Sequence, residues 1–521
     1  MTTEENRLID ELEKKLWTAA DKLRKKVEVH DYKYVVLGLL FLRYISYAFD
    51  QRREELKKEF SNPQSWYYIE DPNERAEALK DEDFYLEEGI LYVPEEAHWD
   101  YLRRNAHRED IGQLINEAIE ILEERYPEKL KDVVPKIYTD PRVNLSHEDL
   151  AYLIDLFTDI EFGDGHKVRD IFGEVYEYFL GKFAEVEGKK GGEFYTPRSL
   201  ARLIVKVLDV QCGTIFDPAC GSGGFFVSAL KKLEEEGKDR YCLEVHGQEA
   251  KTLPWKLCKM NLAIRGVTGD IRLGDTYHDD KFINERFDYV VANPPFNDSR
   301  WGADKVNPND PRYRYGIPPD NNGNFAWIQI FIYHLKPTGK SGFVMANGAL
   351  SVGGIEGEIR KKIIEDDLVY GIVACPPKLF TNVSLPVSLW FCRKQKPEHM
   401  TGKVLFIYAK DMYEPVSRKQ VTFTEEHIER ITEKFKLFEQ GASEEEINEV
   451  GFAKVATLDE IREKGYVLTP GRYVGIKLDE EDEPFEEKMK RYSEELSELL
   501  KNEGELTHKV KEVFKALGFE I

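Results

Sequence analysis

The 521-residue sequence is short of positive charge. Its 74 Lys and Arg residues face 97 Asp and Glu residues, which gives a net charge of −23. Contacts between basic side chains and phosphates supply most of the non-specific affinity for nucleic acids. This charge argues against a protein that holds DNA or RNA unaided. A nucleic-acid substrate would require a local basic surface or a partner subunit.

Long apolar runs are also missing. The longest extends from Tyr34 to Leu42, far below the roughly 20 residues that span a bilayer. The first residues, MTTEENRLIDELEKK, are charged and acidic, unlike a signal peptide or a transit sequence. The sequence therefore predicts a cytoplasmic protein that does not contact a membrane.

Cysteine is scarce as well, with six residues in the chain. They form neither a CxxC pair nor a zinc-ligand spacing, and they lie in apolar runs or beside glycine turns. We therefore expect reduced thiols and no metal site. The six are Cys212, Cys220, Cys242, Cys258, Cys375 and Cys392.

At roughly 150 residues per domain, the length predicts about three domains. Residues 1–165 have a mostly helical pattern, with a buried helix expected from Tyr32 to Phe49, and we predict a packing and interaction domain there. Residues 166–415 form the second domain. Residues 416–521 are charged and helix-rich, and an apolar seam that includes Met489, Tyr492 and Leu496 packs on its own chain or on a partner.

Short apolar strands alternate with amphipathic helices between residues 166 and 415. This alternation predicts an α/β fold with a doubly wound, mainly parallel sheet and helices on both faces. Late strands without helices between them predict an antiparallel edge. The predicted strands are 214–217, 244–249, 286–295, 341–347, 368–375, 387–394 and 403–408, with a further short strand before Gly274.

A glycine-rich turn, FDPACGSGGFF, follows the first of these strands. Asp217 ends the strand, and Gly221, Ser222, Gly223 and Gly224 lead into a helix. Glycines let the backbone approach a ligand closely, and a helix N-terminus offers free N–H groups. The turn has neither the GxGxxG pattern of a dinucleotide site nor the GK[ST] ending of a P-loop. A tight turn without a ligand also stays possible.

Acidic residues follow two neighbouring predicted strands. Glu249 is at the tip of the second strand, where a carboxylate can accept hydrogen bonds from ribose hydroxyls. Asp275 follows the next strand and can accept a hydrogen bond from the amine of a ligand's adenine. Either acid alone would indicate only a surface residue or a turn cap, so this prediction depends on the glycine turn beside them.

Asn293-Pro294-Pro295-Phe296 directly follows the apolar strand FDYVVA. The two prolines fix the backbone and remove two donors, which leaves the Pro294 carbonyl free to accept. Asn293 adds a side-chain carbonyl, and Phe296 adds a flat apolar face. This set suits the exocyclic amine of a base flipped out of its stack. Two acceptors make the amine nitrogen more nucleophilic, so no ionised general base is required.

These motifs resemble those of amino-directed DNA methyltransferases of the gamma order. Most of the chain is similar to the modification subunits of type I restriction-modification systems. The similarity covers the helical N-terminal domain, EFYTPR at 193–198, DPACGSGGF, NPPF with a long polar loop, and TPGRYVG at 469–475. It implies a Rossmann-like, S-adenosylmethionine-dependent methyltransferase domain at 166–415. The helical C-terminal region at 416–521 is implied to contact other subunits.

The resemblance also implies a site and partners. Asn293, Pro294, Pro295 and Phe296 are implied to catalyse methyl transfer to N6 of a flipped-out adenine. The implied partners are double-stranded DNA, a specificity subunit that reads the sequence and a restriction endonuclease subunit, with two copies of this chain per complex. The implied donor pocket consists of Glu193, Phe194, Tyr195, Thr196, Pro197, Arg198, Asp217, Gly221, Ser222, Gly223, Gly224, Glu249 and Asp275.

Other functions stay open. A self-sufficient adenine methyltransferase would need its own recognition domain, and the acidic, helical last hundred residues argue against one. Enzymes with related NPP motifs methylate glutamine amides or RNA, so these acceptors are alternatives to DNA. A non-catalytic scaffold is a further alternative, but it would not need an intact donor loop. The polar loop 297–324 interleaves Arg and Tyr residues, so it either contacts DNA or is a solvated loop.

Overall fold

The structure is a computed structural model. It describes residues 17, 21, 29–143, 145–159, 168–187, 195–380, 386–418, 420–475 and scattered positions between 489 and 503. Residues 1–474 form one compact unit and residues 475–521 a second. Among the described residues, no helix is long and apolar enough to cross a membrane.

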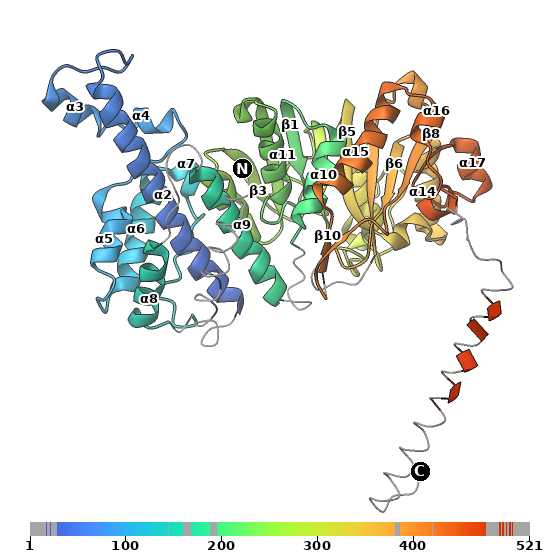
Figure 1. The fold of residues 1–521 in the computed structure, drawn as a ribbon, viewed down its shortest axis with the longest axis horizontal. Helices are drawn as coiled ribbons and strands as arrows, with labels where there is room; N and C mark the ends of the chain where they lie inside the picture. Colours follow the sequence, from blue (N-terminus) through green and yellow to red (C-terminus); the bar gives the residue numbers. More distant parts are fainter. Residues whose placement is uncertain are drawn as a thin grey trace, which may run out of the picture. The chain divides into compact units, whose positions relative to one another are not determined.

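The N-terminal part is built around helix α2 (Val29–Ser61), as Figure 1 shows. Its apolar stretch is buried, which confirms the helix predicted there. Tyr138 Oη donates to the Val35 carbonyl at 3.0 Å, and the Trp99 amide donates to Ser46 Oγ at 2.9 Å. The other helices here are α3 (Pro72–Ala78), α4 (Asp83–Leu86), α5 (Trp99–Arg104), α6 (Ile111–Arg125), α7 (Pro127–Leu130), α8 (His147–Thr158) and α9 (Val168–Glu187).

The second half contains a nine-stranded sheet in the order β11-β8-β6-β7-β5-β4-β1-β2-β3. The parallel strand pairs are β1–β2, β1–β4, β2–β3, β4–β5 and β6–β8. The strands are β1 (Gly213–Asp217), β2 (Leu243–Glu249), β3 (Gly269–Leu273), β4 (Phe287–Ala292), β5 (Leu335–Ala346), β6 (Val369–Ala374), β7 (Val387–Arg393), β8 (Lys403–Tyr408) and β11 (Ala453–Thr457).

Helices cover both faces of this sheet (Figure 1), so the predicted α/β class is confirmed. On one face lie α10 (Arg198–Leu208), α11 (Gly224–Glu235), α12 (Thr252–Ile264) and α15 (Glu425–Gln440). On the other face lie α13 (Asn324–Tyr333), α14 (Gly354–Glu365) and α17 (Leu458–Glu463). α12 has two buried sides: Leu262 packs towards the sheet, and Met260 packs into the core of the N-terminal helices.

Antiparallel strands occur in two places within the nine-stranded sheet, and β9 (Glu414–Ser417) and β10 (Gln420–Thr422) form a separate antiparallel pair. β11 is at the edge of the sheet, where such a strand was predicted, but β7 lies inside it between β5 and β6. The crossover from β5 through α14 to β6 leaves space for one strand, and the chain returns through β7 to fill it. Because β11 lies beyond residue 415, the sheet extends past the end predicted for the α/β domain.

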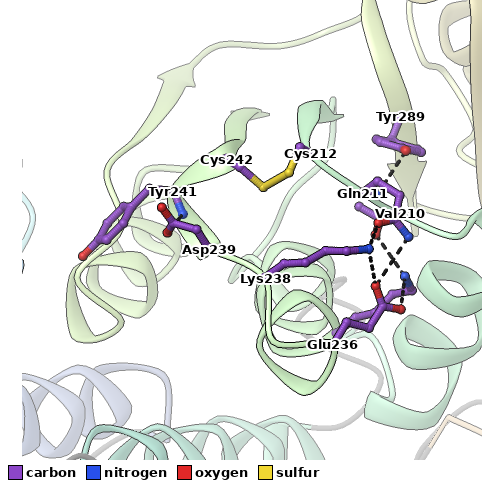
Figure 2. Close-up of a disulfide and its surroundings, with 10 residues drawn as sticks. Val210, Gln211, Cys212, Glu236, Lys238, Asp239, Tyr241, Cys242 and Tyr289 are labelled. Atoms are coloured by element: carbon purple, nitrogen blue, oxygen red, sulfur yellow. Dashed lines mark hydrogen bonds and ion pairs between the residues drawn. A yellow bond between two sulfur atoms is a disulfide. The ribbon is translucent and has the colours of Figure 1, made fainter.

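Cys212 and Cys242 form a disulfide (Figure 2), so the expectation of reduced thiols was wrong for this pair. The two residues directly precede β1 and β2. The parallel register pairs Gly213 with Leu243, so the preceding cysteines lie side by side, with Cα atoms 4.8 Å apart. Their spacing in sequence gives no sign of this pairing, because it depends on strand register. The other four cysteines are buried and outside any disulfide.

We expect reduction of this disulfide to lower the melting temperature. The bond closes a loop with a sequence separation of 30, and restricting the unfolded chain in this way contributes about 3–4 kcal/mol. Calorimetry with and without dithiothreitol measures the effect. Cys212→Ser should melt at the temperature of the reduced protein and should not respond to reductant. Identical melting of oxidised and reduced wild type would contradict this expectation.

Candidate active site

A cavity of about 700 Å³ opens at the edge of the sheet where β1, β2, β3 and β4 end. Among the residues implicated by the sequence, Pro197, Arg198, Asp217, Gly223 and Pro294 do not line it, and Glu193 and Phe194 lie outside the described residues. The lining residues that the sequence had implicated are Tyr195, Thr196, Gly221, Ser222, Gly224, Glu249, Asp275, Asn293, Pro295 and Phe296.

The glycine turn is held against the end of β2. Gly221 and Gly223 have φ angles of 53° and 81°, in the left-handed region that glycine adopts at little cost. A Cβ atom on Gly223 would lie 2.9 Å from Cys258 Sγ. The Gly221 amide donates to Glu249 Oε2 at 3.0 Å, and the Lys251 amide donates to Glu249 Oε1 at 2.9 Å. The turn and Glu249 are therefore positioned together.

Asp217 supports the turn from behind rather than from within the cavity. Its side chain is buried, and Oδ1 accepts a hydrogen bond from the Ala219 amide at 3.0 Å. Burial raises the pKa of this carboxyl well above its ordinary value, and the nearby charge of Glu249 raises it further. The energetic cost of ionising Asp217 would fall if a positively charged ligand lay nearby.

Asn293 presents an unsatisfied oxygen. The residue is 8% exposed, and its Nδ2 donates to Thr196 Oγ1 at 3.2 Å. Its Oδ1 atom is buried and has no hydrogen-bond partner in the described part of the chain. Buried polar atoms usually have a partner, so this oxygen, on a residue that lines the cavity, is available to a donor on a ligand.

Phe296 packs edge-on against Phe380, with ring centroids 5.9 Å apart. Phe380 comes from the loop after β6, and the sequence analysis missed it. No local motif marks this residue, because its contact with Phe296 depends on the order of strands in the sheet. The two rings form an aromatic wall beside Asn293.

Three basic residues outside the predicted catalytic and donor-binding sets also line the cavity: Lys33, Lys251 and Arg300. Lys33 belongs to α2 and is 4% exposed, so the N-terminal helices contribute directly to this wall. The only feature of the sequence that could have indicated a role for Lys33 is its position directly before the apolar run of α2. Acidic residues still match these cations in number, because Asp298 joins Glu249 and Asp275. Burial raises the pKa of Asp298, and the charge of Asp275 adds to the effect.

The polar loop 297–324 is anchored to the rest of the fold, while Arg300, Lys305 and Arg314 within it stay exposed. Its ends are joined by the Asn297 amide, which donates to Asn324 Oδ1, and by Asn324 Nδ2, which donates to Asn297 Oδ1, both at 2.9 Å. Arg312 is buried and donates to the Thr276 and Tyr277 carbonyls at 2.5 and 2.8 Å. Arg312 therefore holds the loop and is not available to DNA.

Arg198 also has a structural contact. Its Nε lies 2.9 Å from Glu177 Oε2 on α9, and Arg265 Nη2 lies 3.1 Å from Glu177 Oε1. One carboxylate thus joins the first residue of α10, the end of α12 and the N-terminal helices. Two residues before Arg198 lies Thr196, which contacts Asn293.

The fold and the site define a nucleic-acid methyltransferase. The model of the N-6 DNA Methylase family matches residues 167–482, and that of the HsdM N-terminal domain matches residues 12–157. The chain is 62% identical over 517 residues to the type I restriction enzyme MjaIX methylase subunit of Methanocaldococcus jannaschii, covering 98% of this chain and 92% of that protein.

Two further relatives agree. The HindI methylase subunit of Haemophilus influenzae is 39% identical over 79% of this chain and 93% of its own length. The crystal structure of a type I methyltransferase subunit from Streptococcus thermophilus superposes with a TM-score of 0.73 at 25% identity, covering 89% of this chain and 99% of that one. This chain belongs to the methylase subunits of type I restriction-modification systems, a family of adenine-specific DNA methyltransferases.

We expect Thr196→Val to lower kcat. Valine has nearly the same shape but cannot accept from Asn293 Nδ2, so the amide loses the contact that fixes its orientation. Loss of one hydrogen bond of about 1 kcal/mol corresponds to a fall of roughly fivefold. Thr196→Ser keeps the hydroxyl and serves as the control. Steady-state methylation measures the effect, and equal kcat for the Val and Ser variants would contradict it.

Proposed function

We propose that S-adenosylmethionine is the methyl donor and that it binds between the glycine turn, Glu249 and Asp275. The donor supplies a methyl group activated by a positive sulfonium. Glu249 accepts from its ribose hydroxyls, and Asp275 accepts from its adenine amine. An adenosine-containing cation is compatible with a wall that includes the acidic residues Glu249, Asp275 and Asp298.

The unpartnered Oδ1 atom of Asn293 is the observation that carries the catalytic proposal. The amine of a flipped-out adenine would donate to this oxygen and to the Pro294 carbonyl. Both bonds draw the lone pair of the amine out of conjugation with the ring, so the nitrogen becomes more nucleophilic. Phe296 holds the base by stacking, and Phe380 supports Phe296. After methyl transfer, one proton of the amine nitrogen is released to solvent.

We further propose that a specificity subunit supplies DNA recognition, in a complex that also contains a restriction endonuclease subunit and two copies of this chain. The charge of −23 and the burial of Arg312 support this division. Met489, Tyr492 and Leu496 of the predicted seam are about half exposed, as a contact surface requires, whereas Phe485 and Leu499 lie outside the described residues. We expect the complex to act in the cytoplasm, because double-stranded DNA is its substrate.

Asn293→Ala should abolish methylation while leaving donor binding intact. The loss of an acceptor that acts on the reacting amine is expected to lower kcat by roughly 100-fold or more, as for other single groups that stabilise a transition state. Asn347→Ala is a matched control, because Asn347 also follows a strand and has an unpartnered Oδ1 but does not line the cavity. Methylation by Asn293→Ala at the wild-type rate would exclude the proposed mechanism.

The division of labour requires a separate assay. The purified chain is incubated with S-adenosylmethionine and mixed-sequence DNA, with and without its specificity subunit, and N6-methyladenine is quantified by mass spectrometry. We expect product only in the presence of the partner. Product from the chain alone would favour a self-sufficient enzyme. Donor binding without DNA methylation in either case would favour RNA or a protein amide as the acceptor.

A further inference from the structure

The turn after β3 carries a histidine that the proposed methyl transfer does not use. His278 Nδ1 lies 2.7 Å from Asp275 Oδ2, and His278 Nε2 lies 3.0 Å from the Gly302 carbonyl oxygen. The His278 side chain is 24% exposed. Gly302 has a φ of 87°, and a Cβ atom there would lie 2.7 Å from His278 Nε2. Glycine is therefore required for this contact.

Both partners of His278 are acceptors. A carboxylate and a backbone carbonyl have no hydrogen to donate, so His278 makes each contact only by donating from the ring nitrogen concerned. The hydrogen bond from Nδ1 goes to the carboxylate of Asp275, and hydrogen bonds to a charged acceptor are stronger than those between neutral groups. The other oxygen of Asp275, Oδ1, accepts from the Tyr277 amide at 3.1 Å. Two donors thus fix the plane of the carboxylate.

The second contact of His278 reaches the loop that begins beside Phe296. Gly302 lies in this loop, where the Gly302 and Ala303 amides donate to Asp320 Oδ1 at 2.8 and 3.0 Å. Arg312, which lies further along the same loop, donates to the Thr276 and Tyr277 carbonyls. One imidazole therefore joins the acid at the donor site to the loop that borders the base pocket.

We propose that His278 is a positioning residue for donor binding. It orients Asp275 towards the adenine amine of the donor and connects that acid to the loop 297–324. This inference rests on the donor site proposed above, because it assigns Asp275 its role there. It predicts that the donor binds tightly only while a hydrogen-bond donor occupies the position of His278 Nδ1 and contacts Asp275.

Two aromatic side chains pack near the imidazole. The ring centroid of His278 lies 6.1 Å from that of Tyr277 and 6.4 Å from that of Trp301, so the turn after β3 and the loop 297–324 both restrict its position.

Two substitutions separate the contacts of His278. The amide nitrogen of His278→Asn can replace Nδ1 at Asp275, whereas that of His278→Gln can replace Nε2 at Gly302. Titration calorimetry of the full-length protein with S-adenosylmethionine measures Kd. His278→Ala and His278→Gln should bind roughly tenfold more weakly than wild type, as loss of one hydrogen bond to a charged group predicts.

His278→Asn should keep an affinity near that of wild type. His107→Ala, at an exposed histidine of the N-terminal helices, is the control and should keep the wild-type Kd. If Asn and Ala weaken binding equally, the positioning role is overturned. If Asp275→Ala leaves Kd unchanged, the proposed donor site itself is wrong. If Asp275→Ala weakens binding and His278→Ala does not, only the present inference fails.

Discussion

The parallel pairing of β1 with β2 and with β4 is the constraint on which the site depends. Parallel strands end on the same side of a sheet, so Asp217, Glu249 and Asn293 reach one edge although they are far apart in sequence. The Cys220 amide donates to the Gln248 carbonyl, and the Gly274 amide to the Glu249 carbonyl, both at 3.0 Å. A shift in register of one residue would turn every side chain to the opposite face and would separate these groups. The Cys212–Cys242 disulfide fixes the opposite end of the β1–β2 pair.

The charge of the chain suits one of its two substrates better than the other. A net charge of −23, with three carboxylates beside three basic side chains in the cavity wall, does not oppose the binding of the positively charged donor proposed above. The same charge repels a polyanion, because affinity for DNA depends on neutralising phosphates. An enzyme of this composition can therefore hold its donor alone, whereas attraction for DNA must come from a local cation such as Arg300 or from another chain.

The features that could be predicted from the sequence are local ones. The alternation of strands and helices, the glycine turn and NPPF each lie within a short segment, and the structure places most of their residues around one cavity. What was missed depends on tertiary neighbours. The disulfide depends on register, the position of β7 depends on a crossover, and Phe380 meets Phe296 only through the order of strands. Arg312 resembled a DNA contact because an exposed arginine and a buried one have the same local sequence signal.

The N-terminal helices belong to the catalytic geometry and are more than an interaction domain. Glu177 on α9 is largely buried between two guanidinium groups, those of Arg198 and Arg265. Removing this carboxylate would leave two neighbouring cations without their shared partner, which is costly for the largely buried Arg265. Arg198 is two residues from Thr196, and Thr196 orients the amide of Asn293. A displacement of α9 would therefore reach the acceptor oxygen of Asn293 through two side-chain contacts and one short segment of backbone. Because Lys33 of α2 lines the same cavity, the helical region both shapes the cavity wall and supports the segment that contacts the side-chain amide of Asn293.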